Sequence, residues 1–297
     1  MKLRHILFSL LLIPSVLAVA QSDKVVEVTY ERSDKGEITF YAETDSYTPY
    51  TVTLSFPRLT NASYPEGTVH EAAIHFGKTR LLVLRPSTEN VPIGFSYRYT
   101  YRKGNFLLKA DTNFVYLFPL AEGKTLRVRY MYSLDRILGK EGQKRLTGFA
   151  FHTTAGDTIF AARGGEVTEV NDNSASTSEG TSFQATENYV EVFHKDGTFA
   201  RYKLFRDGGI FVSPGDEVIP GQPLGIIGGE NYKQGSHLRF SVYCPDLKDY
   251  SYMPDFCLSS EKTGKPEERE IYVSEHPVSF IIQEMSKKAK KKFLSKK

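Results

Sequence analysis

The sequence predicts an all-β protein built from two β-rich domains and a short basic helix at the C-terminal end. Apolar and polar residues alternate with a period of two at 52–56, 95–102 and 124–132, which marks half-buried strands. Turn-forming sequences recur between such runs, for example at 34–36 and 121–124. A chain of 297 residues is long enough for two domains that each have a core.

The first twenty residues have the features of a signal peptide. Lys2 and Arg4 precede an apolar run over 6–19, which ends in the small residues of Ala18–Ala20. This pattern is typical of a cleaved leader, and the run is too short to span a membrane as a helix. We therefore assign 1–20 to a signal peptide and expect export, with the mature protein in the periplasm or outside the cell.

Residues 22–132 form the first predicted domain. Seven or eight short strands at this spacing favour an immunoglobulin-like β-sandwich. Tyrosines alternate with arginines around 97–102, and we interpret the tyrosines as a packed strand face rather than as a sugar-binding surface. The export signal and the small net charge of +3 argue against a nucleic-acid partner.

A connector at 133–147 leads into a second β-rich segment with a series of landmarks. They are Gly148–Phe151, Ala155–Ala162, Gly165–Val167, His194–Gly197, Arg201–Phe205, Val212–Val218, Gly221–Gly225 and His237–Phe240. Their order over roughly Leu146–Val242 resembles the antiparallel β core (the duplicated hybrid motif) of the lysostaphin/LytM-type murein endopeptidases, a family of secreted bacterial zinc enzymes. We assign 148–257 to this LytM-type core and 258–297 to a C-terminal extension.

The resemblance places the family's zinc site on residues that do not ligate zinc. The His-x-x-x-Asp motif falls on Leu146 and Ala150, and Leu204 stands where a catalytic histidine belongs. In the His-x-His motif His237 is retained, but Arg239 replaces the third ligand. A catalytic zinc needs about three protein ligands. We therefore expect no catalytic residues, no metal and no cofactor, with zinc bound only if other ligands rebuild the site.

The former active-site groove remains a candidate binding surface. The side chains expected to line it are those of His237, Arg239, Tyr202, Lys203 and His152. The guanidinium of Arg239 could receive a carboxylate from a peptide or from a partner protein. The alternative is that Arg239 pairs with a carboxylate of its own chain.

The only two cysteines, Cys244 and Cys257, lie just after the His237–Phe240 segment. In an exported protein such a pair favours a disulfide that closes a small loop. The alternative is two buried free thiols. Neither cysteine has a basic neighbour in sequence that would activate it as a nucleophile.

The C-terminal extension concentrates positive charge. Ile282, Met285, Ala289 and Phe293 fall at helical spacing, which predicts an amphipathic helix. An anionic surface is a possible partner for its basic residues, which are Lys287, Lys288, Lys290, Lys291 and Lys292. The alternative is a solvated, frayed tail.

Three functional hypotheses follow. In the first, the domain has lost its zinc ligands and acts by binding, either to peptidoglycan or to a cell-wall hydrolase that it regulates. Degenerate members of the resembling family act as activators of murein amidases. In the second, it is an active murein metalloendopeptidase with non-standard ligands. In the third, it is an envelope scaffold in which the sandwich and the basic tail do the binding. Fold alone does not decide between them.

Overall fold

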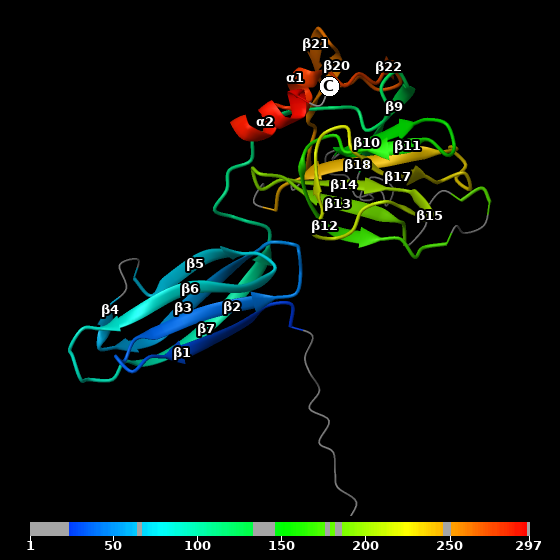
Figure 1. Ribbon diagram of the computed structural model, residues 1–297. Helices are drawn as coiled ribbons and strands as arrows, with labels where there is room; N and C mark the ends of the chain where they lie inside the picture. Colours follow the sequence, from blue (N-terminus) through cyan, green and yellow to red (C-terminus); the bar gives the residue numbers. More distant parts are fainter. Residues whose placement is uncertain are drawn as a thin grey trace, which may run out of the picture.

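The computed structural model describes residues 24–63, 67–132, 146–175, 179–181, 186–245 and 251–295. The predicted signal peptide and most of the predicted connector lie outside these residues. Strands dominate the described chain, and its two helices, α1 (Val278–Ile281) and α2 (Lys287–Leu294), lie near the C-terminus (Figure 1). None of its helices is long and apolar enough to cross a membrane. The all-β prediction is confirmed.

The N-terminal domain is a two-sheet β-sandwich. One sheet has the order β1-β2-β6-β4 and the other β5-β3-β7. The strands are β1 (Glu27–Arg32), β2 (Ile38–Thr44), β3 (Tyr50–Thr60), β4 (Ala62–Ser63), β5 (Val69–Ile74), β6 (Gly77–Pro86) and β7 (Gly94–Lys103). Their inward side chains form one core around Phe40 and Leu54, against which Tyr97 and Tyr99 pack. The arginine between those tyrosines, Arg98, is exposed. An immunoglobulin-like connectivity stays a prediction.

The second domain is built on a large antiparallel sheet with the order β16-β12-β13-β14-β18-β10-β9-β22, and β19 pairs with β18 at one end. Its strands are β9 (Thr125–Tyr132), β10 (Leu146–His152), β12 (Gly165–Asn171), β13 (Tyr189–Phe193), β14 (Phe199–Lys203), β16 (Glu217–Val218), β18 (His237–Tyr243), β19 (Ser251–Tyr252) and β22 (Ile271–Val273). Figure 1 shows this sheet beside the sandwich. It supplies the framework for the site described below.

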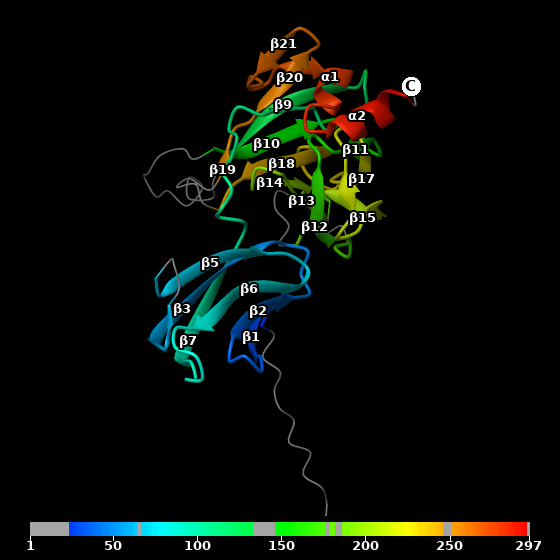
Figure 2. The same cartoon turned by 60° about the vertical axis from the view of Figure 1, so that its left-hand side comes forward.

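Two three-stranded sheets complete the second domain. One has the order β11-β17-β15, with β11 (Thr158–Phe160), β17 (Pro223–Ile227) and β15 (Phe205–Ile210). The other has the order β21-β20-β8, with β21 (Lys262–Gly264), β20 (Asp255–Ser259) and β8 (Val115–Tyr116). Figure 2 shows β20 and β21 beside β9. Apolar side chains from all three sheets form one core, which includes Phe118, Phe151, Phe240 and Phe256.

Both predicted boundaries of the second domain are wrong. The strand at 125–132 alternates as predicted, but as β9 it pairs with β10 rather than with the sandwich. The extension after 257 also joins the domain, because β22 pairs with β9. Alternation identifies a strand and its buried face, but the identity of its partner strand depends on tertiary pairing.

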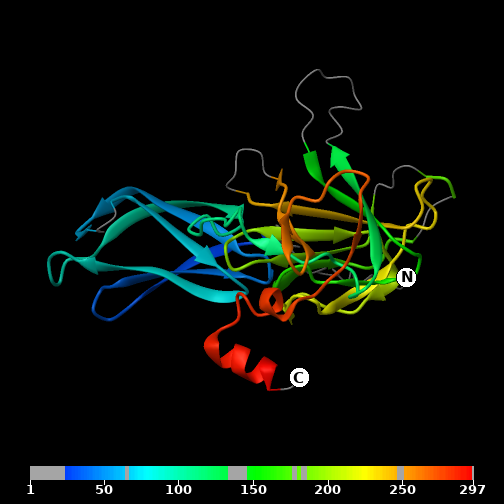
Figure 3. The same ribbon diagram turned by 90° about the horizontal axis from the view of Figure 1, so that it is seen from above.

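The C-terminal segment attaches to the core through a buried arginine. Arg163 is 1% exposed and donates to Glu284 at 2.7 Å and to Asp196 at 3.0 Å. Its guanidinium also lies 3.7 Å from the centre of the Phe114 ring. The amphipathic helix predicted from Ile282 to Phe293 forms only in its second half, because Ile282 and Met285 lie in the turn between α1 and α2 (Figure 3). Ser286 caps α2 by accepting a hydrogen bond from the Ala289 amide.

Candidate functional site

One face of the large sheet carries an unusual density of charged side chains. In the strand register, Lys203 of β14 is opposite Arg239 of β18, and Arg239 is opposite Ala150 of β10. Ala150 in turn is opposite Arg129 of β9. Side chains of successive strand residues point to opposite faces, and Tyr202, Phe240 and Val128 point into the core. The polar residues therefore line the other face together.

A buried carboxylate occupies the centre of this face. Glu187 is 9% exposed, and Arg239 donates a hydrogen bond to its Oε1 atom. Lys203 lies 3.3 Å from its Oε2 atom, and the Tyr232 hydroxyl donates to Oε1 at 3.0 Å. The Arg239 guanidinium also lies 4.9 Å from the centre of the Tyr232 ring. Arg239 thus has a carboxylate partner in its own chain, which was the alternative left open by the sequence.

The resemblance implies zinc, but the residues at this position do not fit a zinc ion. Ala150 and Arg239 are Cα partners across β10 and β18, so two of the assigned ligand positions do meet. One side chain there has no donor atom, and the other is a cation. Glu187 is already engaged by Arg239 and Lys203. Within the described residues, no cluster of three His, Cys, Asp or Glu side chains could hold a metal.

Leu146 and Leu204 occupy the other two positions that the resemblance assigns to the zinc site. Leu146 begins β10 and pairs with Tyr132, ahead of a β-bulge at Gly148. A Cβ atom on Gly148 would lie 2.3 Å from the Phe240 carbonyl oxygen, so glycine is required there. Leu204 has a positive φ of 76°, which is a strained backbone conformation for a leucine. Neither side chain offers a donor to a metal or a proton to a substrate.

His152 and His237 lie side by side on β10 and β18. Their ring centres are 5.0 Å apart, with an angle of 24° between the planes. Nδ1 of His237 lies 2.7 Å from the carbonyl oxygen of Gly235, a geometry in which the ring donates. Burial, with a contribution from Arg239, lowers the pKa of His237 to about 4. Burial, then Arg129, lowers the pKa of His152 as well. Both imidazoles are therefore neutral near pH 7.

Tyr202 does not line the groove, and its prediction as a binding residue is wrong. The side chain is fully buried, and its hydroxyl accepts a hydrogen bond from the Ala162 amide at 2.9 Å. The register explains this, because Tyr202 and Lys203 are neighbours on β14 and so point to opposite faces of the sheet. The resemblance aligned both residues without fixing which face each would occupy.

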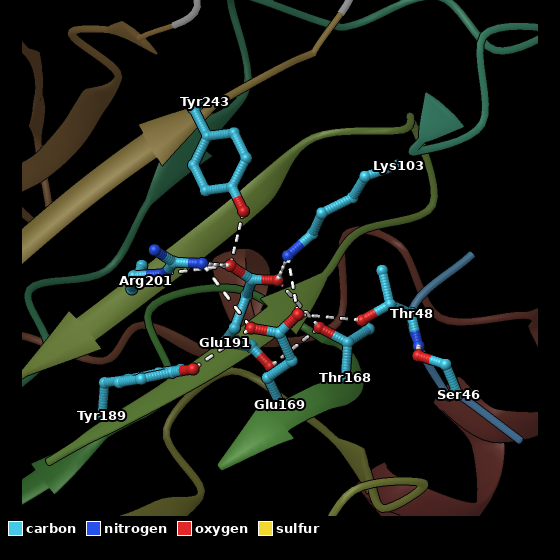
Figure 4. Close-up of polar contacts among 9 residues, drawn as sticks. All are labelled: Ser46, Thr48, Lys103, Thr168, Glu169, Tyr189, Glu191, Arg201 and Tyr243. Carbon is cyan, nitrogen blue, oxygen red and sulfur yellow. Dashed lines mark hydrogen bonds and ion pairs between the residues drawn. The ribbon is translucent and has the colours of Figure 1, made fainter. Parts of the chain in front are cut away.

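A second cluster of charges links this face to the sandwich. Glu191 of β13 is fully buried, and Lys103 at the end of β7 reaches it with a 2.6 Å contact from Nζ to Oε1 (Figure 4). Arg201 and Tyr243 donate to the other oxygen of the same carboxylate. Lys103 also lies 2.9 Å from Glu169. Figure 4 shows these side chains converging, with Thr48 of the sandwich donating to Glu169.

The two clusters flank one open cavity of about 460 Å³. Its lining includes Lys103, Glu187, Arg201, Lys203 and Arg239. Burial disfavours the charged form of Lys103, but Glu191 and Glu169 outweigh it and raise the pKa of this lysine. The arrangement is suited to binding polar or charged ligands. Among the residues that line it, none forms a nucleophile–base pair.

Several residues that build this face were not predicted from the sequence. Glu187, Glu191, Glu169 and Lys103 carry its counter-charges. A usable signal existed in β13, where Glu191 interrupts an otherwise apolar strand of sequence YVEVF. A charge inside such a strand indicates a buried partner. The contribution of Lys103 from another domain had no sequence signal.

The predicted disulfide is absent from the structure. No disulfide joins Cys244 to Cys257, and both side chains are buried. Cys257 lies on β20, in a sheet separate from that of β18, and packs with Leu117 and Ile281. Its Sγ donates to the Ser259 carbonyl oxygen, and burial raises its pKa to about 11. Proximity in sequence did not bring the two sulfur atoms together.

Comparison with known protein families identifies the segment that contains most of this sheet. Residues 144–249 match the model of peptidase family M23. This segment is an M23 domain. The match begins just before β10 and ends after β18, so it contains every position that the resemblance had assigned. The sandwich, β9 and the C-terminal segment lie outside it. No curated protein matches the chain.

Solved structures similar to the chain include three M23-type or zinc-containing proteins. The catalytic domain of lysostaphin from Staphylococcus simulans is 22% identical over 36% of this chain and 73% of its own, with a TM-score of 0.28. The prophage-encoded M23 protein EnpA from Enterococcus faecalis is 21% identical over 42% and 87%, with a TM-score of 0.30. A zinc-containing peptidase from Vibrio cholerae is 14% identical over 76% and 83%, with a TM-score of 0.34. These values support no functional argument.

Proposed function

We propose that this protein is a non-catalytic M23-type protein of the cell envelope that acts by binding peptidoglycan or a cell-wall hydrolase. The observation that carries the proposal is the Arg239–Glu187 ion pair at a position where the resemblance expects a zinc ligand. Positive charge at that position opposes a metal cation. The M23 domain supplies the link to cell-wall peptide chemistry.

Charge and exposure favour a binding role for the same face. The cavity of about 460 Å³ is open and is lined mainly by polar side chains. Arginine and lysine side chains recognise carboxylates through charge-assisted hydrogen bonds. Peptidoglycan stem peptides carry free carboxylates, as do acidic surfaces of proteins. Export through the N-terminal signal peptide is part of this proposal and would bring the domain to such ligands.

Zinc content and murein digestion provide the first test. We expect the purified mature protein to hold less than about a tenth of an equivalent of zinc and to leave murein intact after zinc is added. Near-stoichiometric zinc that survives dialysis, with digestion, would instead establish the metallopeptidase with non-standard ligands.

A restored variant serves as the matched control. Leu146→His, Ala150→Asp and Arg239→His together supply the donors that the resemblance expects. We expect this triple variant to take up zinc under conditions where the natural protein does not, measured by elemental analysis. Failure of a folded triple variant to bind zinc would show that the assigned positions are not the ligand positions.

Binding is tested by co-sedimentation with purified peptidoglycan and by capture of envelope hydrolases. Arg239→Gln together with Glu187→Gln removes both charges of the central pair, which avoids leaving one buried charge alone. We expect this double variant to lose binding while it stays folded. If binding persisted and was lost only on deletion of the sandwich or the basic tail, the scaffold hypothesis would replace this proposal.

A further inference from the structure

A second pocket lies beside the cavity of about 460 Å³. Its lining contains none of the positions that the resemblance assigns to the zinc site. It has a volume of about 530 Å³ and is lined by residues of β9, β10 and β22 together with Thr153 and Gln234. Two of its side chains, Arg127 and Arg129, belong to β9, which lies outside the matched segment 144–249. His152 also lines it and stacks on His237, so the pocket adjoins the central site.

The two arginines differ from the other cations of this face in their counter-charges. Arg239 and Lys203 pair with Glu187, and Arg201 pairs with Glu191. For Arg127 and Arg129, the part of the chain that the structure describes provides no ion pair. Both side chains are exposed. Burial and then Arg129 lower the pKa of the adjacent His152, which is the effect expected of an uncompensated positive field.

The geometry of the pair suits a single oxyanion. Arg127 and Arg129 alternate with the buried Leu126 and Val128, so both guanidinium groups leave the same face of β9. Residues two apart on a strand are separated by about 7 Å, a spacing that long arginine side chains can close around one carboxylate. The amide of Gln234 lies in the same pocket as a further polar group.

The pocket also has an apolar side. Ile271 of β22 is opposite Arg127 in the strand register, lines the pocket and is 54% exposed. A ligand that places a carboxylate beside a small apolar group would contact the arginines and Ile271 together. The C-terminal residue of a peptide has this composition, since its carboxylate and its side chain leave the same carbon atom.

We propose that this pocket binds the C-terminal carboxylate of a peptide that ends in a small apolar residue. The residues that form it are distinct from the Arg239–Glu187 pair, and only the choice of a cell-wall peptide as probe rests on the proposed function. Arg127 and Arg129 hold the carboxylate, and Ile271 contacts the terminal side chain. The rest of the peptide would extend past His152 toward the central cavity.

The test uses acetyl-lysyl-D-alanyl-D-alanine, its C-terminal amide and inorganic phosphate, titrated into the full mature protein by calorimetry. We expect the free acid to bind and the amide to bind at least about tenfold more weakly, because the amide lacks the charge that both arginines recognise. Arg127→Gln and Arg129→Gln should each weaken binding of the acid about tenfold or more. Arg98→Gln, the same change at an exposed sandwich strand, should have no effect.

Circular dichroism and thermal melting confirm that each variant is folded before its affinity is compared. Equal binding of the acid and the amide, or unchanged affinity in the folded Arg127→Gln/Arg129→Gln double variant, would overturn the proposal. Binding of phosphate without binding of the peptide would overturn the peptide as ligand. If this site fails while the Arg239→Gln/Glu187→Gln variant still loses peptidoglycan binding, the proposed function stands without it.

Discussion

At the scale of single residues, Arg239 is the residue on which the proposed binding role rests. A histidine there would offer a neutral donor, whereas the guanidinium is permanently charged and draws Glu187 into an ion pair. Ala150, its Cα partner on the neighbouring strand, adds neither a charge nor a donor atom. The same sheet positions are therefore filled by a network that satisfies its own charges.

His237 provides a residue-scale prediction about pH. Its pKa is lowered from 6.5 to about 4 by burial, so the unfolded chain binds a proton that the folded one rejects. The contribution of this imidazole to the free energy of unfolding is fully present above about pH 6.5. It is lost as the pH drops toward 4, by up to about 3 kcal/mol. The free energy of unfolding in urea should fall less between pH 7 and pH 4.5 for His237→Asn than for the natural protein.

The matched control for that experiment is His75→Asn, because His75 is exposed on the sandwich. Carboxylates such as Glu169, whose pKa is lowered by Lys103 against the effect of burial, also lose stabilising charge in acid. Their contribution is common to all three proteins and cancels in the comparison. An identical acid dependence in His237→Asn and the natural protein would contradict the assignment.

At the scale of elements, β9 and α2 extend the M23 domain in different ways. β9 joins the large sheet through β10 and brings Arg127 and Arg129 to the charged face of that sheet. Helix α2 has no buried residue, and only Phe293 of this helix packs against the apolar cluster around Ile281. Its surface is therefore available to an external partner, which we propose to be an anionic surface.

The lysines of α2 give the prediction at this scale. Replacement of Lys287, Lys288, Lys290, Lys291 and Lys292 by glutamine should reduce binding to phosphatidylglycerol vesicles by about a hundredfold or more, since each contributes about 1 kcal/mol near an anionic surface. Flotation assays at low and high salt would measure it, and salt should weaken the natural protein similarly. Lys35→Gln and Lys109→Gln, exposed elsewhere, should change nothing. Retained binding in the five-lysine variant would show that α2 is not the element that binds the vesicles.

At the scale of the whole molecule, Lys103 joins the two domains. It leaves the last strand of the sandwich and contacts the fully buried Glu191 at 2.6 Å. Thr48 of the sandwich adds a hydrogen bond to Glu169. The sandwich thus supplies a counter-charge at one end of the charged sheet face, whereas Arg127 and Arg129 at the other end have no ion pair within the described residues.

Lys103→Met tests this connection. The substitution leaves Glu191 buried with one cation fewer and should cost about 2–3 kcal/mol of folding free energy. Lys78→Met is the matched control, because Lys78 makes an ion pair of 2.9 Å with Glu31 whose two side chains are 46% and 61% exposed. That exposed pair is screened by solvent, so its loss should lower the free energy of unfolding much less than Lys103→Met does. Equal losses in urea unfolding would contradict a buried link between the domains.

The sequence by itself determined the β class of both domains and the M23 resemblance, and it placed Ala150 and Arg239 at positions where that resemblance expects ligands. These follow from alternation, turn residues and motif spacing, which are local properties. Tertiary structure decided that Arg239 meets Glu187, that Tyr202 points inward, that β9 belongs to the second domain and that the two cysteines form no disulfide. Each depends on strand pairing between distant segments, and register sets which face every side chain occupies.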